Sequence, residues 1–170
     1  LLILGLIIVV AFSFSISSAT LVSQHLGAGD LKGAYDAGWK TMRTCLYIMI
    51  TGSVVMCWYA HDIARFMIDD PEVIRHMVQF TYILGACLPL MAVEFSMAGA
   101  LRGAGDTRYP MMVTVFSILL TRIIAPWVLV TMGAEVVWLY ATSLVDFSIK
   151  SSLNMRRFRK KGWLKAHSQQ

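Results

Sequence analysis

The chain has 170 residues, of which 57% are apolar and 15% are charged, and its mean hydropathy is +0.63. Roughly a quarter of the residues in a soluble domain are charged because its surface faces water, so this composition excludes a soluble domain. The charges are clustered, and the apolar runs between them are long enough to cross a bilayer, which takes about 20 helical residues. We therefore expect an all-α integral membrane protein with about five transmembrane helices.

The first predicted span covers about residues 1–24 and ends at the sequence G-A-G-D over 27–30. Glycine ends helices because it adopts the left-handed conformation, and aspartate is a good N-cap for the next helix. The second predicted helix begins near Leu31 with amphipathic turns at the interface, and its span covers about 39–59. A short interfacial helix is expected over 61–68, because this segment is too short and too polar to cross the membrane.

Three further spans are predicted over about 76–100, 109–132 and 135–155, followed by a basic cytoplasmic tail over 156–170. Pro89 and Pro126 fall inside two of these spans. A proline lacks the backbone N–H and crowds the carbonyl four residues earlier, so both are candidates for helix kinks that take part in gating. Gly99 and Gly103 favour close packing of their span against another helix.

Lys and Arg gather on one side of this predicted topology. Most of the fifteen lie in the loops near 30–43 and 102–108 and from Lys150 onward. The positive-inside rule places this side, together with the C-terminus, in the cytoplasm, and we expect a multi-pass protein of the inner or plasma membrane. Five spans then put residue 1 outside, and because the chain shows no signal sequence we expect at least one further helix upstream.

The sequence G-A-G-D occurs twice, each time at the predicted cytoplasmic end of a span. One interpretation is that G-A-G-D suits a turn between two helices and occurs twice by chance. The other is internal structural repetition, which is common in transporters. The residues concerned are Gly27, Gly29 and Asp30 in the first turn and Gly103, Gly105 and Asp106 in the second.

Several segments resemble the signatures of a known family. They are Q-H-L-G-A-G-D over 24–30, A-L-R-G-A-G-D-T-R-Y-P-M over 100–111, T-R-I-I over 121–124 and R-R-F-R-K-K-G-W over 156–163. In this order they resemble the multidrug and toxic compound extrusion (MATE) family, with Ile124 where proline is usual. The resemblance implies that the helices are spans eight to twelve of a twelve-helix transporter, which is most of its C-terminal lobe. The N-terminal lobe of the same protein would then be a partner of this chain.

The resemblance also implies a function, namely an antiporter coupled to H⁺ or Na⁺ that exports lipophilic and cationic organic compounds. One alternative is a lipid-linked oligosaccharide flippase of the wider superfamily, which would need a cavity rich in Arg and Lys. Another is a non-transporting membrane scaffold, since half a transporter cannot alternate access. An enzyme is not expected, because H-E-x-x-H, G-x-S-x-G and paired intramembrane aspartates are missing from the sequence. We expect no cofactor besides the coupling ion, no metal site and no nucleic-acid partner, and we expect the basic tail to contact anionic lipid.

Three charged residues lie inside the predicted spans, where a charge costs at least ~2.5 kcal/mol and needs a partner or a function. Counted along the helices at about 1.5 Å per residue, Arg122 and Asp146 lie at similar depths. We therefore expect an ion pair between them. It would either hold two helices together or belong to a site for a coupling ion or substrate.

Glu94 lies roughly 10 Å below the cytoplasmic boundary, and its difference in depth from Arg122 argues against a pair between them. An unpaired carboxylate that faces a cavity can exchange protons near neutrality, so Glu94 is a candidate for coupling or for binding a substrate cation. In the resembled family a carboxylate on the tenth span does this work in some branches, about one turn closer to the outside, near Leu90 or Met91. The alternative for Glu94 is a hydrogen bond between helices or a position that faces a loop.

Overall fold

The computed structural model describes residues 2–67, 71–124, 127, 136–161 and 163. Within these ranges every regular element is a helix. They are α1 (Leu2–Gly27), α2 (Leu31–Trp58), α3 (Ala60–Met67), α4 (Pro71–Gly103), α5 (Arg108–Ile118), the π-helix η1 (Leu119–Ile124) and α7 (Val136–Arg159). The all-α class predicted from the sequence is confirmed.

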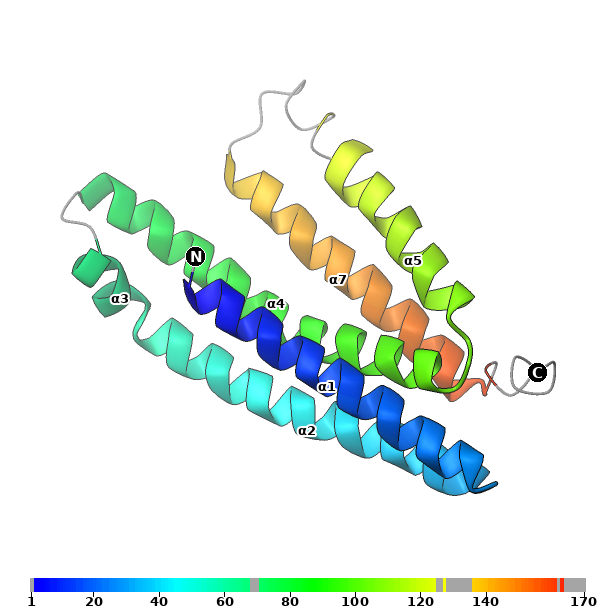
Figure 1. Ribbon diagram of the computed structural model, residues 1–170. Coiled ribbons are helices and arrows are strands. Elements are labelled where there is room, and N and C mark those ends of the chain that lie inside the picture. Colours follow the sequence, from blue (N-terminus) through cyan, green and yellow to red (C-terminus); the bar gives the residue numbers. More distant parts are fainter. Residues whose placement is uncertain (1, 68–70, 125–126, 128–135, 162, 164–170) are drawn as a thin grey trace.

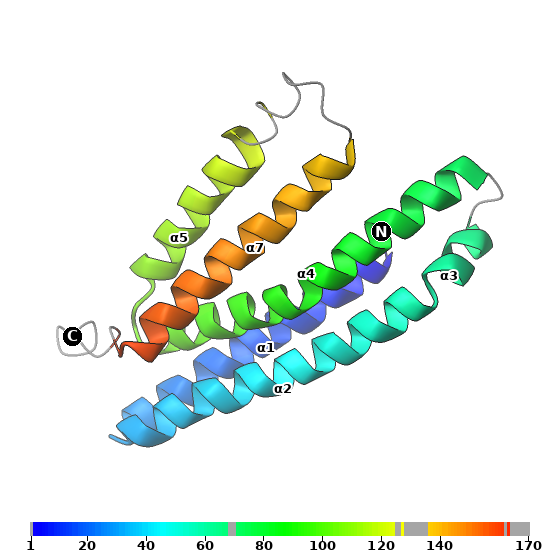
Figure 2. The same cartoon turned by 180° about the vertical axis from the view of Figure 1, so that it is seen from behind.

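Helix α4 is the central element of the bundle. It packs against α1, α2 and α7, and α1 and α2 also pack against each other. Helices α5 and η1 pack mainly against α7 and form a second layer beside the α1–α2–α4 group (Figures 1 and 2). The α1–α2 turn, the α4–α5 turn and the end of α7 lie at one end of the molecule, and α3 lies at the other (Figure 1).

Three of the described helices are long and apolar enough to cross a membrane: Gly5–Gly27, Leu31–Trp58 and Val73–Gly103. A shorter apolar helix covers Arg108–Thr121. Part of the predicted span over 109–132 and the start of the predicted span over 135–155 lie outside the described residues. Many large apolar side chains face outward from the helices, Ile16 at 66% exposure and Trp58 at 80% among them, and lipid would cover such surfaces in a membrane.

Helices α1 and α4 approach each other through small residues. A Cβ atom built on Gly99 would lie 2.2 Å from the backbone oxygen of Ser15, and one built on Gly103 would lie 2.2 Å from that of Ala19. A side chain at either glycine would force the two helices apart, and this close approach is the packing that the two glycines predict. The guanidinium of Arg102 adds a hydrogen bond of 2.8 Å to the Ser15 hydroxyl across the same interface.

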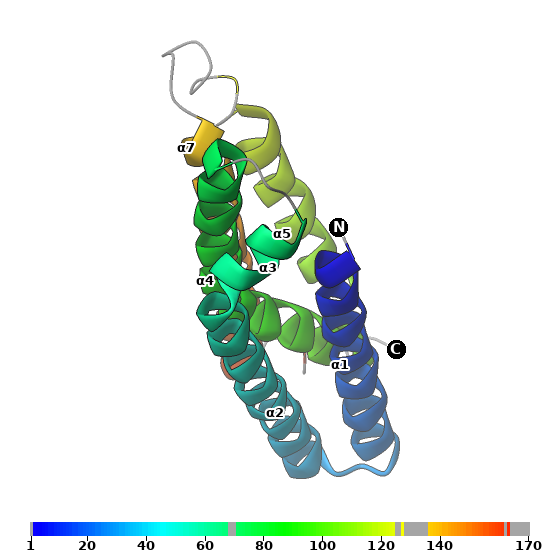
Figure 3. The same ribbon diagram turned by 90° about the vertical axis from the view of Figure 1, so that its left-hand side faces the viewer.

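Helix α4 bends in its middle (Figure 3), and Pro89 lies inside it. A proline cannot donate to the carbonyl four residues earlier, which here belongs to Gly85. The hydroxyl of Ser53 on α2 donates to that carbonyl instead, at 2.8 Å. The carbonyl freed by the proline is therefore satisfied by a neighbouring helix, as a membrane interior requires. A gating role for Pro89 stays a prediction, and Pro126 lies outside the described residues.

Candidate functional site

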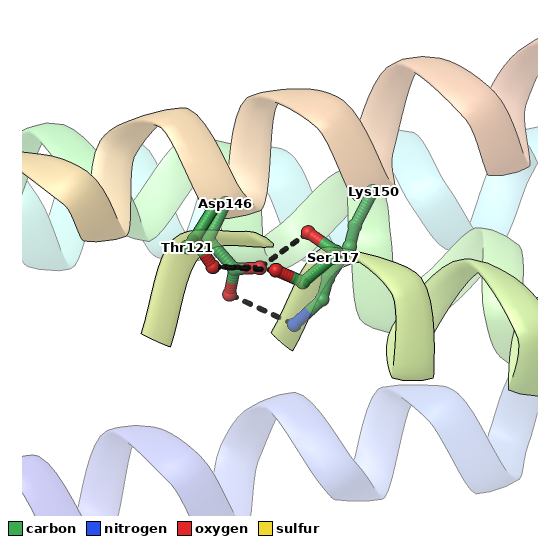
Figure 4. Close-up of polar contacts among 4 residues, drawn as sticks. All are labelled: Ser117, Thr121, Asp146 and Lys150. Carbon is green, nitrogen blue, oxygen red and sulfur yellow. Dashed lines mark hydrogen bonds and ion pairs between the residues drawn. The ribbon is translucent and has the colours of Figure 1, made fainter. Parts of the chain in front are cut away.

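A cluster of polar side chains is buried between α7 on one side and α5 with η1 on the other, centred on Asp146 (Figure 4). The ammonium of Lys150 lies 2.8 Å from Oδ2 of Asp146. The hydroxyl of Ser117 donates to Oδ1, and Thr121 Oγ1 lies 3.1 Å from the same oxygen. Both oxygens of the carboxylate thus have polar partners although Asp146 is only 1% exposed.

Helical periodicity brings these four residues together. Asp146 and Lys150 are four residues apart on α7, and Ser117 and Thr121 are four residues apart across the junction of α5 and η1, so each pair lies on one helix face. Thr121 Oγ1 also lies 2.7 Å from the carbonyl of Ser117. Because a hydroxyl has a single proton, Thr121 donates to either this carbonyl or Asp146 at any one time. The helix takes π geometry from Leu119 to Ile124, and π segments frequently occur at functional sites.

The ion pair of the cluster is almost fully shielded, because the side chains of Lys150 and Asp146 are 8% and 2% exposed. Taking two charges out of water costs several kcal/mol per ion, and good geometry with added hydrogen bonds offsets that cost. Removal of one partner from such a pair leaves an uncompensated charge and costs about 3–5 kcal/mol. The cluster can therefore serve either to hold α7 against α5 and η1 or to bind a cation. The groups around it decide between these two roles.

Another buried carboxylate, that of Glu94 on α4, lies within the electrostatic reach of this cluster. It is 8% exposed, and the charges that act on it are those of Lys150, Arg102 and Asp146. Among the described residues no group forms a hydrogen bond with its carboxyl. Lys150 is thus in direct contact with one carboxylate, Asp146, and acts at longer range on a second, Glu94, from another helix.

Asp146 contacts a residue that the sequence analysis did not propose as its partner. We expected Arg122, whose backbone lies in η1 but whose side chain falls outside the described residues, so that pair stays a prediction. The count of basic residues places Lys150 with the cytoplasmic charges, yet its side chain is buried and contacts the carboxylate of Asp146, one turn earlier on α7. The i, i+4 spacing of an Asp and a Lys in an apolar helix was the signal that would have found it.

Metal ligands are not grouped in the described part of the chain, where no three His, Cys, Asp or Glu side chains lie close enough to hold an ion. The oxygens around Asp146 come from one carboxylate and two hydroxyls.

The two G-A-G-D turns share one backbone structure. Gly29 and Gly105 have φ angles of 76° and 85°, in the left-handed region that favours glycine. In both turns the glycine N–H donates three residues back and the aspartate N–H donates five residues back, which is the Schellman pattern of helix ends.

The two aspartates of these turns have different partners. Asp30 caps α2 by accepting the Gly33 N–H at 2.9 Å, and this hydrogen bond holds the pKa of its carboxyl below the ordinary value. Asp106 is buried and accepts from Nε of Arg157 at 2.9 Å, which joins the α4–α5 turn to the end of α7. Thr107, not the aspartate, precedes α5. The repeated sequence therefore gives a repeated turn with two different side-chain roles.

The MatE family model matches residues 1–128. The chain belongs to the MATE family. This confirms the resemblance seen in the sequence signatures, and family membership together with the three long apolar helices supports a membrane location. Glu94 lies within the residues matched by the MATE model, whereas Asp146 and Lys150 lie beyond them.

Two similar proteins agree with this assignment. The chain is 27% identical over 161 residues to a probable multidrug resistance protein NorM of Thermotoga maritima, covering 91% of this chain and 34% of that protein. It also matches the structure of an inward-facing multidrug resistance MATE family transporter of the MOP superfamily, with a TM-score of 0.80, 21% identity and coverage of 88% of this chain and 34% of the other. The likeness to that structure shows a shared MATE fold. The chain spans about a third of the length of both relatives.

Proposed function

We propose that this chain is part of a cation-coupled antiporter that uses H⁺ or Na⁺ to export lipophilic and cationic organic compounds, with its C-terminus in the cytoplasm. MATE membership supports export, because the NorM relative and the structural neighbour are both described as multidrug resistance proteins. The observation that carries the coupling part is the buried Lys150 ammonium, which contacts Asp146 and acts on Glu94 from a second helix.

Two carboxylates that act on one ammonium form an exchangeable cation site. A proton, a sodium ion or a substrate cation that reaches Asp146 or Glu94 competes with Lys150 for a carboxylate. Because the three charges act on one another in a shielded region, occupation by one cation disfavours a second. Transport follows when the coupling ion and the substrate have different affinities for the inward-open and outward-open states.

The proposal predicts that Glu94→Gln abolishes efflux. Glutamine keeps the size of the side chain and removes its ability to carry charge or exchange a proton. Cells that express the full-length transporter would be loaded with ethidium, and the decrease in fluorescence would be followed at several external pH values. We expect efflux in Glu94→Gln cells to fall to the level of cells without the transporter.

The matched control is Asp62→Asn, which neutralises an exposed carboxylate on α3 and should leave efflux unchanged. Wild-type efflux with unchanged pH dependence in Glu94→Gln would exclude Glu94 as a coupling residue. Wild-type efflux that responds to neither a proton gradient nor a sodium gradient would contradict cation coupling as a whole.

A further inference from the structure

The first half of α2 borders a groove that the transport mechanism does not use. It consists of two adjoining cavities of about 490 and 230 Å³ that share Tyr35 and Asp36 as lining residues. Trp39, Lys40 and Arg43 complete the first cavity, and Leu31, Lys32, Lys161 and Trp163 complete the second. The groove therefore joins α2 to the segment that follows α7.

Basic side chains outnumber acidic ones in the lining of this groove. It includes Lys32, Lys40, Arg43 and Lys161, against the single carboxylate of Asp36. None of these basic side chains forms an ion pair with another described residue. A cavity lined by Lys and Arg side chains without ion-pair partners attracts anions. Phosphate oxygens are strong hydrogen-bond acceptors for Lys and Arg.

Stacked aromatic rings fix the wall of the groove. Tyr35 stacks on Phe158 with ring centroids 5.5 Å apart, and Phe158 stacks on Trp163 at 5.9 Å. Phe158 is fully buried and sits against Gly38, where a Cβ atom would lie 2.5 Å from its ring. The segment after α7 is thereby held against α2, so the groove is a built feature of the fold.

Lys161 takes a backbone position that glycine takes after α1 and after α4. Its φ angle is 54°, and its N–H donates to the carbonyl of Phe158, as the N–H groups of Gly29 and Gly105 do to the carbonyls three residues earlier. The left-handed conformation is unfavourable for a residue with a Cβ atom, so a glycine would suit the backbone better. The lysine ammonium lies 5.5 Å from the centre of the Tyr35 ring, at the edge of the second cavity.

The groove lies where the polar half of α2 meets its apolar half. Beyond Arg43 the exposed face of the helix is apolar, with Tyr47, Ile48, Ile50, Val54 and Val55 all outward-facing. The protein therefore offers basic side chains at one end of this surface and a long apolar helix face at the other. A ligand that matches both has an acidic group joined to an apolar part. A phospholipid has both, whereas free phosphate has only the first.

We propose that this groove binds the headgroup of an anionic phospholipid, with its acyl chains along the apolar face of α2. Lys40 and Arg43 contact the phosphate, and Lys161 neutralises the far side of the headgroup. Asp36 lowers the positive charge of the groove and limits the affinity, so its neutralisation strengthens binding. This proposal does not depend on the transport mechanism.

The test uses the full-length transporter, purified and returned to phosphatidylcholine nanodiscs that contain increasing fractions of phosphatidylglycerol. Retained phosphatidylglycerol would be counted by native mass spectrometry. We expect Lys40→Gln with Arg43→Gln to weaken binding at one site by about fivefold for each charge removed, and Asp36→Asn to strengthen it. Arg159→Gln with Lys160→Gln is the control, because both residues are exposed on the same end of the molecule and neither lines the groove.

Opposite shifts for the basic and acidic variants, with an unchanged control, support the proposal, since misfolding would not strengthen binding in Asp36→Asn. Equal losses in the control and the groove variants would overturn it in favour of general surface attraction. Unchanged phosphatidylglycerol binding in Lys40→Gln with Arg43→Gln would also overturn it. A third arm adds inorganic phosphate, and displacement of the lipid by millimolar phosphate would identify a free-anion site instead.

Discussion

The carboxylate of Asp146 depends on three neighbours that differ in chemistry. Lys150 supplies charge, and Ser117 and Thr121 supply hydroxyl groups from the facing helix. Breaking a buried pair costs more than replacing both members with apolar groups, because only the former leaves a charge without compensation. The two charged positions should therefore be strongly coupled in mutagenesis.

A double-mutant cycle at this pair tests the contact. Asp146→Leu and Lys150→Met should each destabilise the full-length transporter by about 3–5 kcal/mol, while the double variant should lose clearly less than the sum. The measurement is the melting temperature of the purified protein in one detergent. Strictly additive losses would show that the two side chains do not interact in the folded protein, and Arg122 would then become the leading partner for Asp146.

The structure of helix α4 depends on how the neighbouring helices accommodate its proline and its glycines. Pro89 frees the carbonyl of Gly85, and Ser53 of α2 donates to that carbonyl. Gly99 has no side chain, and any side chain at this position would collide with the backbone of α1. Both arrangements depend on contacts between helices that are distant in sequence.

Loss of the Ser53 hydroxyl should leave the Gly85 carbonyl without a partner. We expect Ser53→Ala to lower stability by about 1–3 kcal/mol, the cost of an unsatisfied buried acceptor. Thr51→Ala is the control, because the Thr51 hydroxyl bonds to the carbonyl of Tyr47 within its own helix on an exposed face. Thermal unfolding of both variants gives the comparison, and equal effects would mean that the α2–α4 hydrogen bond contributes nothing specific.

The close approach of α1 to α4 can be tested by adding a methyl group at Gly99. Gly99→Ala adds a methyl group 2.2 Å from the Ser15 oxygen, so the helices must move apart and stability should fall by about 1–3 kcal/mol. Gly52→Ala serves as the control, since a Cβ atom there meets nothing within 4 Å and alanine favours a helix by about 1 kcal/mol. Melting temperatures should move in opposite directions, and a neutral Gly99→Ala would contradict the close packing.

The local features of these helices were predictable from the sequence, and their partners were not. Glycine at 27–30 and 103–106 predicts the ends of α1 and α4, and Asp30 predicts the start of α2, because left-handed glycine and capping are local effects. The burial of Lys150 could not be predicted from a count of basic residues, because the outcome depends on which helix faces α7. The acceptor of the Ser53 hydroxyl could not be predicted from the sequence for the same reason, because it lies on another helix.

Family membership and the arrangement of the helices describe the molecule as a whole. The MATE assignment rests on residues 1–128, and the chain covers about a third of its relatives. Both G-A-G-D turns lie at the end of the bundle where α7 finishes, which agrees with the arrangement expected from the distribution of Lys and Arg (Figure 1). Glu94 and Asp146 lie inside α4 and α7, not in the last turns of these helices.

The most direct measurement is the release of the coupling ion when a substrate cation binds. The purified full-length transporter, in weakly buffered detergent solution near neutral pH, would be titrated with tetraphenylphosphonium. Released protons would be followed with an indicator dye and displaced sodium with a radioactive tracer. We predict that the wild type releases one of the two ions. A variant with Glu94→Gln, Asp146→Asn and Lys150→Met should remain folded and release neither. Ion release from this variant equal to that of the wild type, or substrate binding by the wild type without any release, would contradict a coupling site in these helices.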